Sequence, residues 1–281
     1  MVRFFRFEAE DGGIRYGIQH ADGSSTEAEG CPFASNLRDT GRPAVARRWL
    51  APVEPSAIVC IGLNYSKHAA ELGLPKPVNP VIFMKPSSSA VGHGARVAKP
   101  RLTQKMDYEV ELAVVIGKPC KDVTPSEALE FVLGYTVAND LSTRDWQKVP
   151  ELAGGQWCRS KGFDGFSPLG PVLVTRDEIP DPGQLWLRSS VNGELRQNSS
   201  TSDLIFNVQE IISFLSAGCT IMPGTVIMTG TPAGVAEGMK GQPWLKPGDK
   251  VVTEIEKIGS LEIDIVEDTS SVKCYANMAK L

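Results

Sequence analysis

The alternation of hydrophobic and polar positions predicts a chain made mainly of β-strands. Short apolar runs recur along it, and turns rich in glycine and proline separate them about every ten residues. Two segments instead favour short helices, residues 64–73 and residues 126–132. The strongest strand patterns, one of them a hairpin, are AIVCIG (57–62), PVIFMKP (80–86), DYEVELAVVIG (107–117), GYTVAND (134–140), TVIMTGTPAG (225–234) and VVTEIEKIGSLEIDIVE (251–267).

The turn pattern divides the chain into a small N-terminal unit and a larger one. Residues 1–52 have the pattern of short strands joined by glycine-rich turns, which predicts a small β-rich domain. APVEPSA (51–57) carries two prolines and has the composition of a linker. Residues 58–281 form the second predicted domain. Because strands outnumber helices and no internal repeat occurs, we predict an α+β, β-dominated fold and not a doubly wound α/β sheet.

The predicted strand 107–117 carries two glutamates in its first half. Side chains alternate across a strand, so Glu109 and Glu111 share a face with Asp107, and this face becomes apolar after Glu111. The pattern indicates a buried strand that emerges into a pocket. Two carboxylates there repel each other unless a proton or a cation intervenes, and Mg²⁺ and Ca²⁺ prefer such oxygen ligands. An equally open interpretation is a solvated strand end with two ordinary glutamates.

Asp140 supplies a third carboxylate at the end of the predicted strand 134–140. Together with Glu109 and Glu111 it would give the oxygen-rich ligand set of a catalytic Mg²⁺ or Mn²⁺, with positions left for water and substrate. Alternatively, Asp140 caps the segment that follows it, which is a common role for aspartate.

Composition narrows the classes of function. The formal net charge of −4 offers no basic surface for nucleic acid, and no apolar stretch is long enough to span a bilayer. Only three histidines occur, and there is no HExxH motif, which argues against a histidine-rich zinc site. The six cysteines are scattered without a CxxC pair, and the first thirty residues lack a secretory signal pattern. We therefore expect a reduced, intracellular protein.

Seven motifs in the same order between residues 58 and 265 resemble the fumarylacetoacetate hydrolase (FAH) family. They are IGLNYSKHAAELG, FMKPSSS, DYEVELAVVIGK, GYTVANDLSTRDWQ, GGQWCRSKGFDGFSPLGP, VNGELRQ and MTGTPAGV. The similarity is greatest to the small FAH-domain-containing enzymes, which include acylpyruvate hydrolases and oxaloacetate decarboxylases. The resemblance implies an FAH-type rolled β-sandwich with a mixed, barrel-like core, and a homodimer. It also implies a Mg²⁺ enzyme, with Mn²⁺ or Ca²⁺ as alternatives, whose metal ligands fall on Glu109, Glu111 and Asp140.

The resemblance assigns the catalytic residues to His68, Glu71 and Lys161. His68 and Glu71 lie three positions apart on a predicted helix, where a carboxylate can orient the imidazole as a general base. In the family this dyad lies on a segment that orders over the site when ligand binds; we call residues 64–80 the lid segment. The lysine that matches Lys161 stabilises negative charge on the substrate. Without the resemblance, an exposed histidine and an exposed lysine are the more common interpretations.

Substrate binding is assigned by the same resemblance to Arg144, Gln147 and Thr231. Arg144 is equally well explained by a structural pair with Asp145 or another acid. Thr231 lies in a turn whose backbone N–H groups and hydroxyl can hold a carboxylate, although a simple Gly-Pro turn explains it too. Lys85 has weaker support.

We therefore expect a divalent-metal-dependent hydrolase that cleaves a C–C bond in acylpyruvates or related 1,3-diketo acids. His68, held by Glu71, would deprotonate a water that attacks the distal carbonyl, and the departing carbanion would be delocalised as an enolate. The metal and Lys161 would stabilise that charge. Oxaloacetate decarboxylation at the same site stays open, as do a catalytically inactive FAH-fold binding protein and, as a minor option, isomerase or hydratase activity.

The location of the protein in the cell is open between two expectations. The chain ends in Ala-Lys-Leu (279–281), one change from the peroxisomal address Ser-Lys-Leu. A cytoplasmic location is at least as well supported, because a three-residue match arises easily by chance.

Overall fold

The computed structural model describes residues 2–150, 152 and 155–270. Strands dominate this part of the chain. They are β1 Arg3–Ala9, β2 Ile14–Gln19, β3 Ser25–Glu29, β4 Arg38–Pro43, β5 Ala46–Leu50, β6 Ala57–Gly62, β7 Val81–Lys85, β8 Ala90–Val91, β9 Ala95–Lys99, β10 Met106–Asp107, β11 Val110–Ile116, β12 Val132–Asn139, β13 Ser142–Thr143, β14 Ser167–Thr175, β15 Trp186–Val191, β16 Glu194–Ser200, β17 Thr225–Met228, β18 Lys250–Ile255 and β19 Gly259–Glu267.

The helices of the same residues are short and lie between the strands. The α-helices are α1 Ser66–Glu71, α2 Arg144–Lys148, α3 Trp157–Lys161 and α4 Val208–Ser216. Single turns of 3₁₀-helix occur at Pro32–Ala34, Ser87–Ser89, Ala128–Phe131, Pro182–Gln184 and Thr201–Asp203. Among the helices of the described residues, α4 alone carries a complete capping box, in which Asn207 and Glu210 exchange side-chain to backbone hydrogen bonds.

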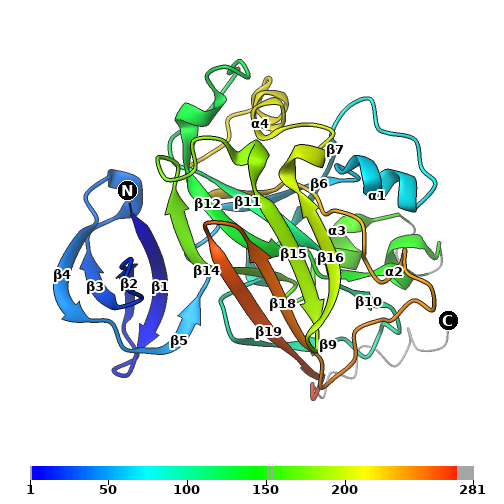
Figure 1. Ribbon diagram of the computed structural model, residues 1–281, viewed down its shortest axis with the longest axis horizontal. Coiled ribbons are helices and arrows are strands. Elements are labelled where there is room, and N and C mark those ends of the chain that lie inside the picture. The colour runs from blue at the N-terminus through cyan, green and yellow to red at the C-terminus, as the bar shows by residue number, and fades with distance from the viewer. Residues whose placement is uncertain (1, 151, 153–154, 271–281) are drawn as a thin grey trace.

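Two layers of sheet form the body of the molecule. The large sheet follows the order β4-β3-β2-β1-β14-β12-β11-β17-β6-β7, with β5 paired to β1 and β8 to β14. The second sheet follows the order β16-β15-β18-β19-β9, and its strands lie in front of β11, β12 and β14 in Figure 1. Both sheets mix parallel and antiparallel pairs, as at β6–β17 and β9–β19. The α+β, β-dominated class predicted from the sequence is confirmed.

Strand β11 lies at the centre of the core, and all seven of its residues are buried. Val110, Leu112, Val114 and Ile116 face one hydrophobic cluster, whereas Ala113 and Val115 face another. It pairs with β12 along its whole length and with β17 at Ala113–Val115. A strand buried on both faces explains the apolar run in the sequence, and it leaves Glu111 as the one ionisable side chain within β11.

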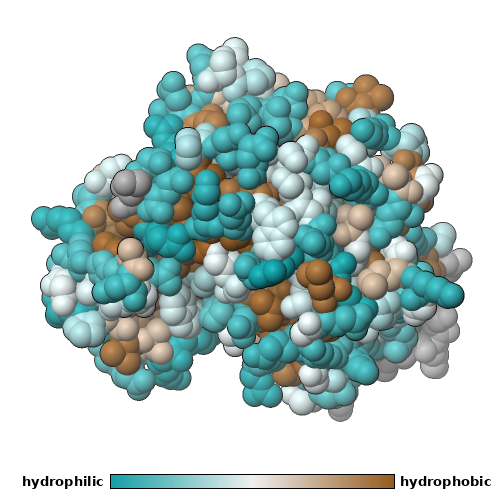
Figure 2. All heavy atoms as spheres, viewed as in Figure 1, coloured by the Kyte–Doolittle hydropathy of each residue, from teal (hydrophilic) through white to brown (hydrophobic). Residues whose placement is uncertain are grey.

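One face of the second sheet is exposed to solvent. Buried and exposed residues alternate along β15 and β18, and residues such as Val251 and Ile255 point into the core. The opposite face is open to solvent, and the view in Figure 2 is largely hydrophilic with scattered hydrophobic residues. The predicted hairpin 251–267 is present as β18 and β19, which pair from Ile255 and Gly259 outward.

The N-terminal strands form a curled lobe at the left of Figure 1. Strand β1 pairs with β14, so the hydrogen-bonded sheet continues from this lobe into the rest of the molecule. A separate domain at residues 1–52, with a second one at 58–281, remains a prediction.

Two local predictions are corrected. The segment predicted as one strand over 107–117 is divided, because Met106 and Asp107 pair with β13 while β11 begins at Val110. The helix predicted over 126–132 is only a 3₁₀ turn, Ala128–Phe131, and Val132 already pairs with Ile116 of β11. A segment this short does not form a stable α-helix by itself. Its last residue, the β-branched Val132, is instead the first residue of β12.

Within the described residues, no helix is long and apolar enough to cross a membrane. The C-terminal Ala-Lys-Leu lies outside the described residues, so the peroxisomal and cytoplasmic alternatives remain predictions.

Candidate active site

Antiparallel pairing brings three carboxylates to one end of the large sheet. Val110 at the start of β11 pairs with Asn139 at the end of β12, so Glu109 and Glu111 meet Asp140. The Asp140 N–H donates to the Glu109 carbonyl at 2.9 Å, and the Glu109 N–H donates to Asn139 Oδ1 at 2.9 Å. The backbone therefore fixes the relative positions of two of the three carboxylates.

The spacing of these carboxylates fits a divalent ion. One oxygen each from Glu109, Glu111 and Asp140 lies within 4.8 Å of the other two, and all three residues are buried. Oxygen ligands on opposite sides of Mg²⁺ or Ca²⁺ lie about 4–5 Å apart, because the individual bonds are about 2.0–2.6 Å long. An all-carboxylate donor set also favours these hard cations over zinc or copper.

Glu111 is the member of the set whose charge is least compensated. It accepts one hydrogen bond, from the backbone N–H of Gly230 at 2.7 Å, and forms no ion pair with any described residue. Gly230 has a φ of +103°, a conformation that glycine adopts without strain, and a Cβ there would lie 2.7 Å from Asn64. Burial, followed by the charges of Asp140 and Glu109, raises the pKa of Glu111 well above its usual value. A bound cation would remove this penalty.

Glu109 and Asp140 share a lysine. Lys161, at the end of α3, places Nζ 2.8 Å from Glu109 Oε2 and 2.6 Å from Asp140 Oδ2. Lys85 of β7 places its Nζ 2.5 Å from Asp140 Oδ1 and 2.6 Å from the Phe166 carbonyl oxygen. Burial acts against charge on Glu109, but Lys161 and Arg144 outweigh it and lower the pKa of Glu109 well below its usual value. Burial likewise acts against charge on Lys161, yet Asp140 and Glu109 raise its pKa.

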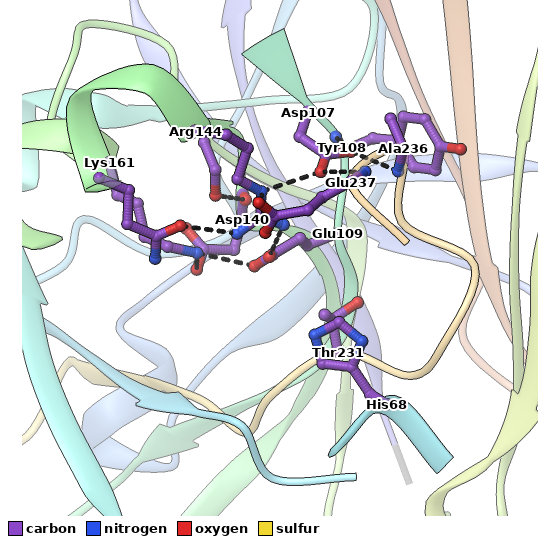
Figure 3. A network of polar contacts seen from close by, with 12 residues as sticks. His68, Asp107, Tyr108, Glu109, Asp140, Arg144, Lys161, Thr231, Ala236 and Glu237 are labelled. Atoms are coloured by element: carbon purple, nitrogen blue, oxygen red, sulfur yellow. Dashed lines mark hydrogen bonds and ion pairs between the residues drawn. The ribbon is translucent and has the colours of Figure 1, made fainter. Parts of the chain in front are cut away.

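Arg144 bridges the cluster to a second acid. Its Nη2 contacts Glu109, its Nε donates to Asp107 Oδ2 at 2.9 Å, and its Nη1 donates to Gln147 Oε1 at 3.0 Å. Figure 3 shows Arg144 between Asp107 and Glu109, with Lys161 on the far side of Asp140. The structural partner of Arg144 is therefore not Asp145, which instead accepts hydrogen bonds from the Thr103 hydroxyl and the Gln104 N–H.

His68 and Glu71 form the expected pair on α1. His68 Nδ1 lies 2.9 Å from Glu71 Oε2, and Glu71 Oε1 accepts a hydrogen bond from the Gly234 N–H at 2.9 Å. With Nδ1 held by a carboxylate, the geometry assigns the proton to Nδ1 and leaves the Nε2 lone pair free. In Figure 3 the His68 ring lies below the carboxylate cluster, and Lys161 lies to the left of it.

Thr231 is near the cluster but its hydroxyl is already engaged. It donates to the Val110 carbonyl at 3.0 Å and accepts from Gln197 Nε2 at 2.8 Å. A direct donor role toward a substrate would therefore require this hydroxyl to leave Val110. Gln147 differs, because no described residue accepts a hydrogen bond from its amide nitrogen.

A cavity of about 370 Å³ connects most of these groups, a size suited to a small ligand. Its polar end holds the three carboxylates and the other predicted residues, and its apolar wall comes from β6, the lid segment, β7 and α3. The lining residues include His68, Glu109, Glu111, Asp140, Arg144, Gln147, Lys161 and Thr231, with Leu72, Leu74, Val81, Phe83 and Trp157 on the apolar side.

Sequence reasoning missed two acids and undervalued one lysine. Asp107 and Glu237 both contact Arg144, and Lys85 holds Asp140. The sequence did contain an indication for Asp107, because Asp107 lies on the same predicted strand face as Glu109 and Glu111. It contained no such indication for Glu237, which lies in a loop far along the chain.

Comparisons with known proteins show which family this chain resembles. The family model "Fumarylacetoacetate (FAA) hydrolase C-terminal" matches residues 57–266. A putative hydrolase of Burkholderia multivorans is 50% identical over 200 residues, which cover 71% of this chain and 70% of that protein. A mitochondrial oxaloacetate tautomerase of Xenopus laevis is 45% identical over 218 residues, covering 77% and 68%.

Solved structures extend the similarity to the whole fold. The 2-hydroxyhepta-2,4-diene-1,7-dioate isomerase of Mycobacterium marinum superposes with a TM-score of 0.82 and 37% identity, over 96% of this chain and 100% of that one. The match includes the N-terminal lobe as well as the strands that carry the carboxylates, since it leaves only a small part of the chain uncovered. On the extent of the family match and these identities, the chain belongs to the fumarylacetoacetate hydrolase family.

Proposed function

We propose that this chain is a divalent-metal-dependent hydrolase that cleaves a C–C bond in an acylpyruvate or a related 1,3-diketo acid. One observation carries the proposal: His68 and the three carboxylates line the same cavity, and Glu71 holds His68 from outside it. Hydrolysis needs an activated water beside a centre that stabilises negative charge, and this arrangement offers both.

Glu109, Glu111 and Asp140 are the residues that would hold the ion. We propose Mg²⁺, with Mn²⁺ or Ca²⁺ as alternatives, because all three ligands are carboxylates. When bound, the ion would supply positive charge that orients and polarises the oxygens of a 2-oxo acid.

His68 is the proposed general base. Its Nε2 takes a proton from water, and Glu71 stabilises the imidazolium that forms. The hydroxide oxygen attacks the distal carbonyl, and the C–C bond to the pyruvate unit then breaks. Its electron pair moves onto pyruvate as an enolate, and a proton returned to carbon completes the two products. The acyl group leaves as a carboxylic acid.

The surrounding residues orient the substrate and stabilise its charge. Lys161 carries a buried positive charge at the polar end of the cavity and is the proposed partner of the developing enolate. The amide nitrogen of Gln147 donates to no described residue, and Arg144 fixes its carbonyl end. Thr231 is proposed to contact the substrate after releasing Val110. The lid segment is proposed to close over the cavity, which Leu72 and Leu74 already line.

The test is a panel of acylpyruvates, fumarylpyruvate and oxaloacetate, each assayed with Mg²⁺ and the purified protein. We expect acylpyruvate cleavage to be the fastest reaction. Turnover of oxaloacetate far above that of every diketo acid would replace the hydrolase proposal, and a protein inert toward the whole panel would favour a binding role.

Oxaloacetate chemistry is the second candidate, favoured by the similarity to the Xenopus laevis oxaloacetate tautomerase. Decarboxylation or tautomerisation of oxaloacetate would use the same carboxylates and Lys161. Neither reaction needs a nucleophilic water. Substitution of His68 by alanine should therefore reduce decarboxylation less than it reduces hydrolysis, and this difference separates these two reactions. Tautomerisation removes a proton from carbon and would still use a base, so it is identified instead by its product.

We also propose that the protein is a homodimer, as the family resemblance implies. One surface supports it: exposed large hydrophobic residues gather in the lid segment and on the sheet-edge strand β7, at Leu74, Val78, Val81, Ile82 and Met84. Light scattering on the wild-type protein and on Ile82→Glu tests this proposal, and a wild-type monomer would contradict it.

A further inference from the structure

Asp107 is a fully buried acid that lies outside the cavity and receives hydrogen bonds from three segments. Its Oδ2 accepts from Arg144 Nε at 2.9 Å and from the Glu237 N–H at 3.2 Å. Its Oδ1 accepts from the Ala236 N–H at 2.8 Å and from the adjacent Tyr108 N–H at 2.9 Å. β10, α2 and the turn at residues 234–237 therefore meet at one carboxylate (Figure 3).

On one side, Asp107 sets the direction of Arg144. The guanidinium uses its Nε on Asp107, which leaves Nη2 for Glu109 and Nη1 for Gln147. A planar guanidinium donates in fixed directions, so the anchor at Nε determines where the other two nitrogens point. Asp107 thereby acts on a proposed metal ligand and a proposed substrate-binding residue through Arg144.

On the other side, Asp107 holds the turn at residues 234–237. The N–H of Gly234, in the same turn, donates to Glu71 Oε1, and Glu71 Oε2 contacts His68 Nδ1. The contacts thus form a continuous chain from Asp107 through the turn to the dyad. Residues 107 and 71 are far apart in sequence, and the turn is what joins them.

Helix α1 depends on such outside contacts. It has only six residues, and no side chain caps its N-terminus. A helix this short is marginal by itself in water, so its position is set by contacts with other segments. Asn64, Asp203 and Gly234 supply them at the entry, the first turn and the last residue.

The chemistry of the position favours aspartate over asparagine. All four groups around the Asp107 side chain are donors: three backbone N–H groups and one guanidinium nitrogen. A carboxylate accepts on both oxygens, whereas the NH₂ of asparagine would face donors at one end. An unsatisfied buried donor is costly, so the substitution should loosen either the turn or Arg144.

We infer that Asp107 is a positioning residue that couples the carboxylate cluster to the His68–Glu71 dyad, through Arg144 on one side and the turn at residues 234–237 on the other. The inference rests on the proposed function for the roles of His68 and Glu109. The coupling itself can be measured without any substrate.

Asp107→Asn tests the inference, with Asp145→Asn as the matched control. Asp145 follows Arg144 in α2 and also accepts several hydrogen bonds, yet its side chain bonds neither to the Arg144 guanidinium nor to the turn at residues 234–237. Hydrogen exchange should become about tenfold faster in the peptides covering the turn and α1 of Asp107→Asn, and remain at wild-type rates there in Asp145→Asn. Calorimetry with Mg²⁺ alone should show weaker binding only in Asp107→Asn.

The hydrogen-exchange measurement needs no substrate. The positioning role of Asp107 can therefore be rejected or supported even if the protein cleaves no diketo acid. Wild-type exchange in α1 of Asp107→Asn overturns that role, and so does equal acceleration in both variants. If Asp107→Asn does not fold, the double variant Asp107→Asn with Arg144→Gln also removes the guanidinium that has lost its Asp107 partner, and it carries the same exchange test of the turn and α1. Where activity is present, kcat should fall in Asp107→Asn more than KM rises.

Discussion

The buried carboxylate of Glu111 accepts a hydrogen bond from the Gly230 N–H at 2.7 Å but has no cationic partner among the described residues. Glu109 and Asp140 beside it are each held by positive side chains. Among the described residues, Glu111 is thus the one carboxylate of the three without an ion pair. Burial and the neighbouring acids raise the pKa of Glu111, so the metal-free protein keeps the Glu111 proton to a higher pH than the unfolded chain does.

Binding of a divalent ion should therefore release a proton. A ligand carboxylate must be ionised, and Glu111 is the one with a raised pKa. We expect Mg²⁺ affinity to rise with pH, and calorimetry in buffers of different ionisation enthalpy to report proton release. Glu111→Gln should abolish the release and weaken binding. Proton release that persists in Glu111→Gln would place its source elsewhere.

The stability of the metal-free protein should fall as pH rises. The unfolded chain loses the Glu111 proton near the ordinary pKa of 4.5, whereas the native state keeps it to higher pH. In the window between these values the native state binds more protons, so stability falls as pH increases. Asp107, whose pKa burial also raises, contributes with the same sign.

Calorimetric melting in a chelator from about pH 5 to pH 8 measures this slope. Glu111→Gln should show a flatter curve than the wild type, and saturating Mg²⁺ should stabilise the wild type most at the alkaline end. Identical slopes for wild type and Glu111→Gln would exclude Glu111 as the source.

Lys85→Met should destabilise the fold. Lys85 is buried and contacts both Asp140 and the Phe166 carbonyl, so its loss leaves two buried acceptors with fewer partners. Removing one partner of a buried ion pair costs about 3–5 kcal/mol. Chemical denaturation measures the loss, with Lys250→Met of the exposed Lys250–Glu262 pair as the control that should change little. A difference between the two variants near zero would contradict the structural role of Lys85.

His68→Ala should slow acylpyruvate cleavage by about 10²–10⁴-fold, the usual contribution of a general base. Glu71→Gln should cost less, about 10–100-fold, because the imidazole stays but loses the carboxylate that orients it. Steady-state kinetics give both values. Metal affinity measured by calorimetry should stay near that of the wild type in both variants, and a large loss of affinity would indicate that the dyad acts through the metal.

Much of the site was predictable because it follows from strand alternation. Glu111 is a charged residue within the otherwise apolar strand β11. The pairing of β11 with β12 brings Asp140 to the same end of the sheet. The His68–Glu71 contact follows from helical spacing. Strand alternation and helical spacing both depend only on residues that are close in the sequence, so they can be read without knowing the fold.

The parts that were missed depend on contacts between distant segments. Glu237 reaches Arg144 from a loop far along the chain, and no local pattern marks it. The end of β10 at Asp107 depends on pairing with β13, which the continuous pattern of residues 107–117 concealed. The failed helix at 126–132 has the same cause, because Val132 pairs with Ile116 and the sheet overrides a weak helical preference.

Acylpyruvate cleavage by the metal-free protein shows whether the reaction depends on a divalent ion. The rate is measured after exhaustive chelation, and again after Mg²⁺ is restored in excess of the chelator. We expect a loss of at least about 10²-fold on chelation, recovery with Mg²⁺ in the wild type, and no recovery in Asp140→Ala that retains its fold. An undiminished rate in the metal-free protein, or full recovery in Asp140→Ala, would contradict the proposed metal dependence.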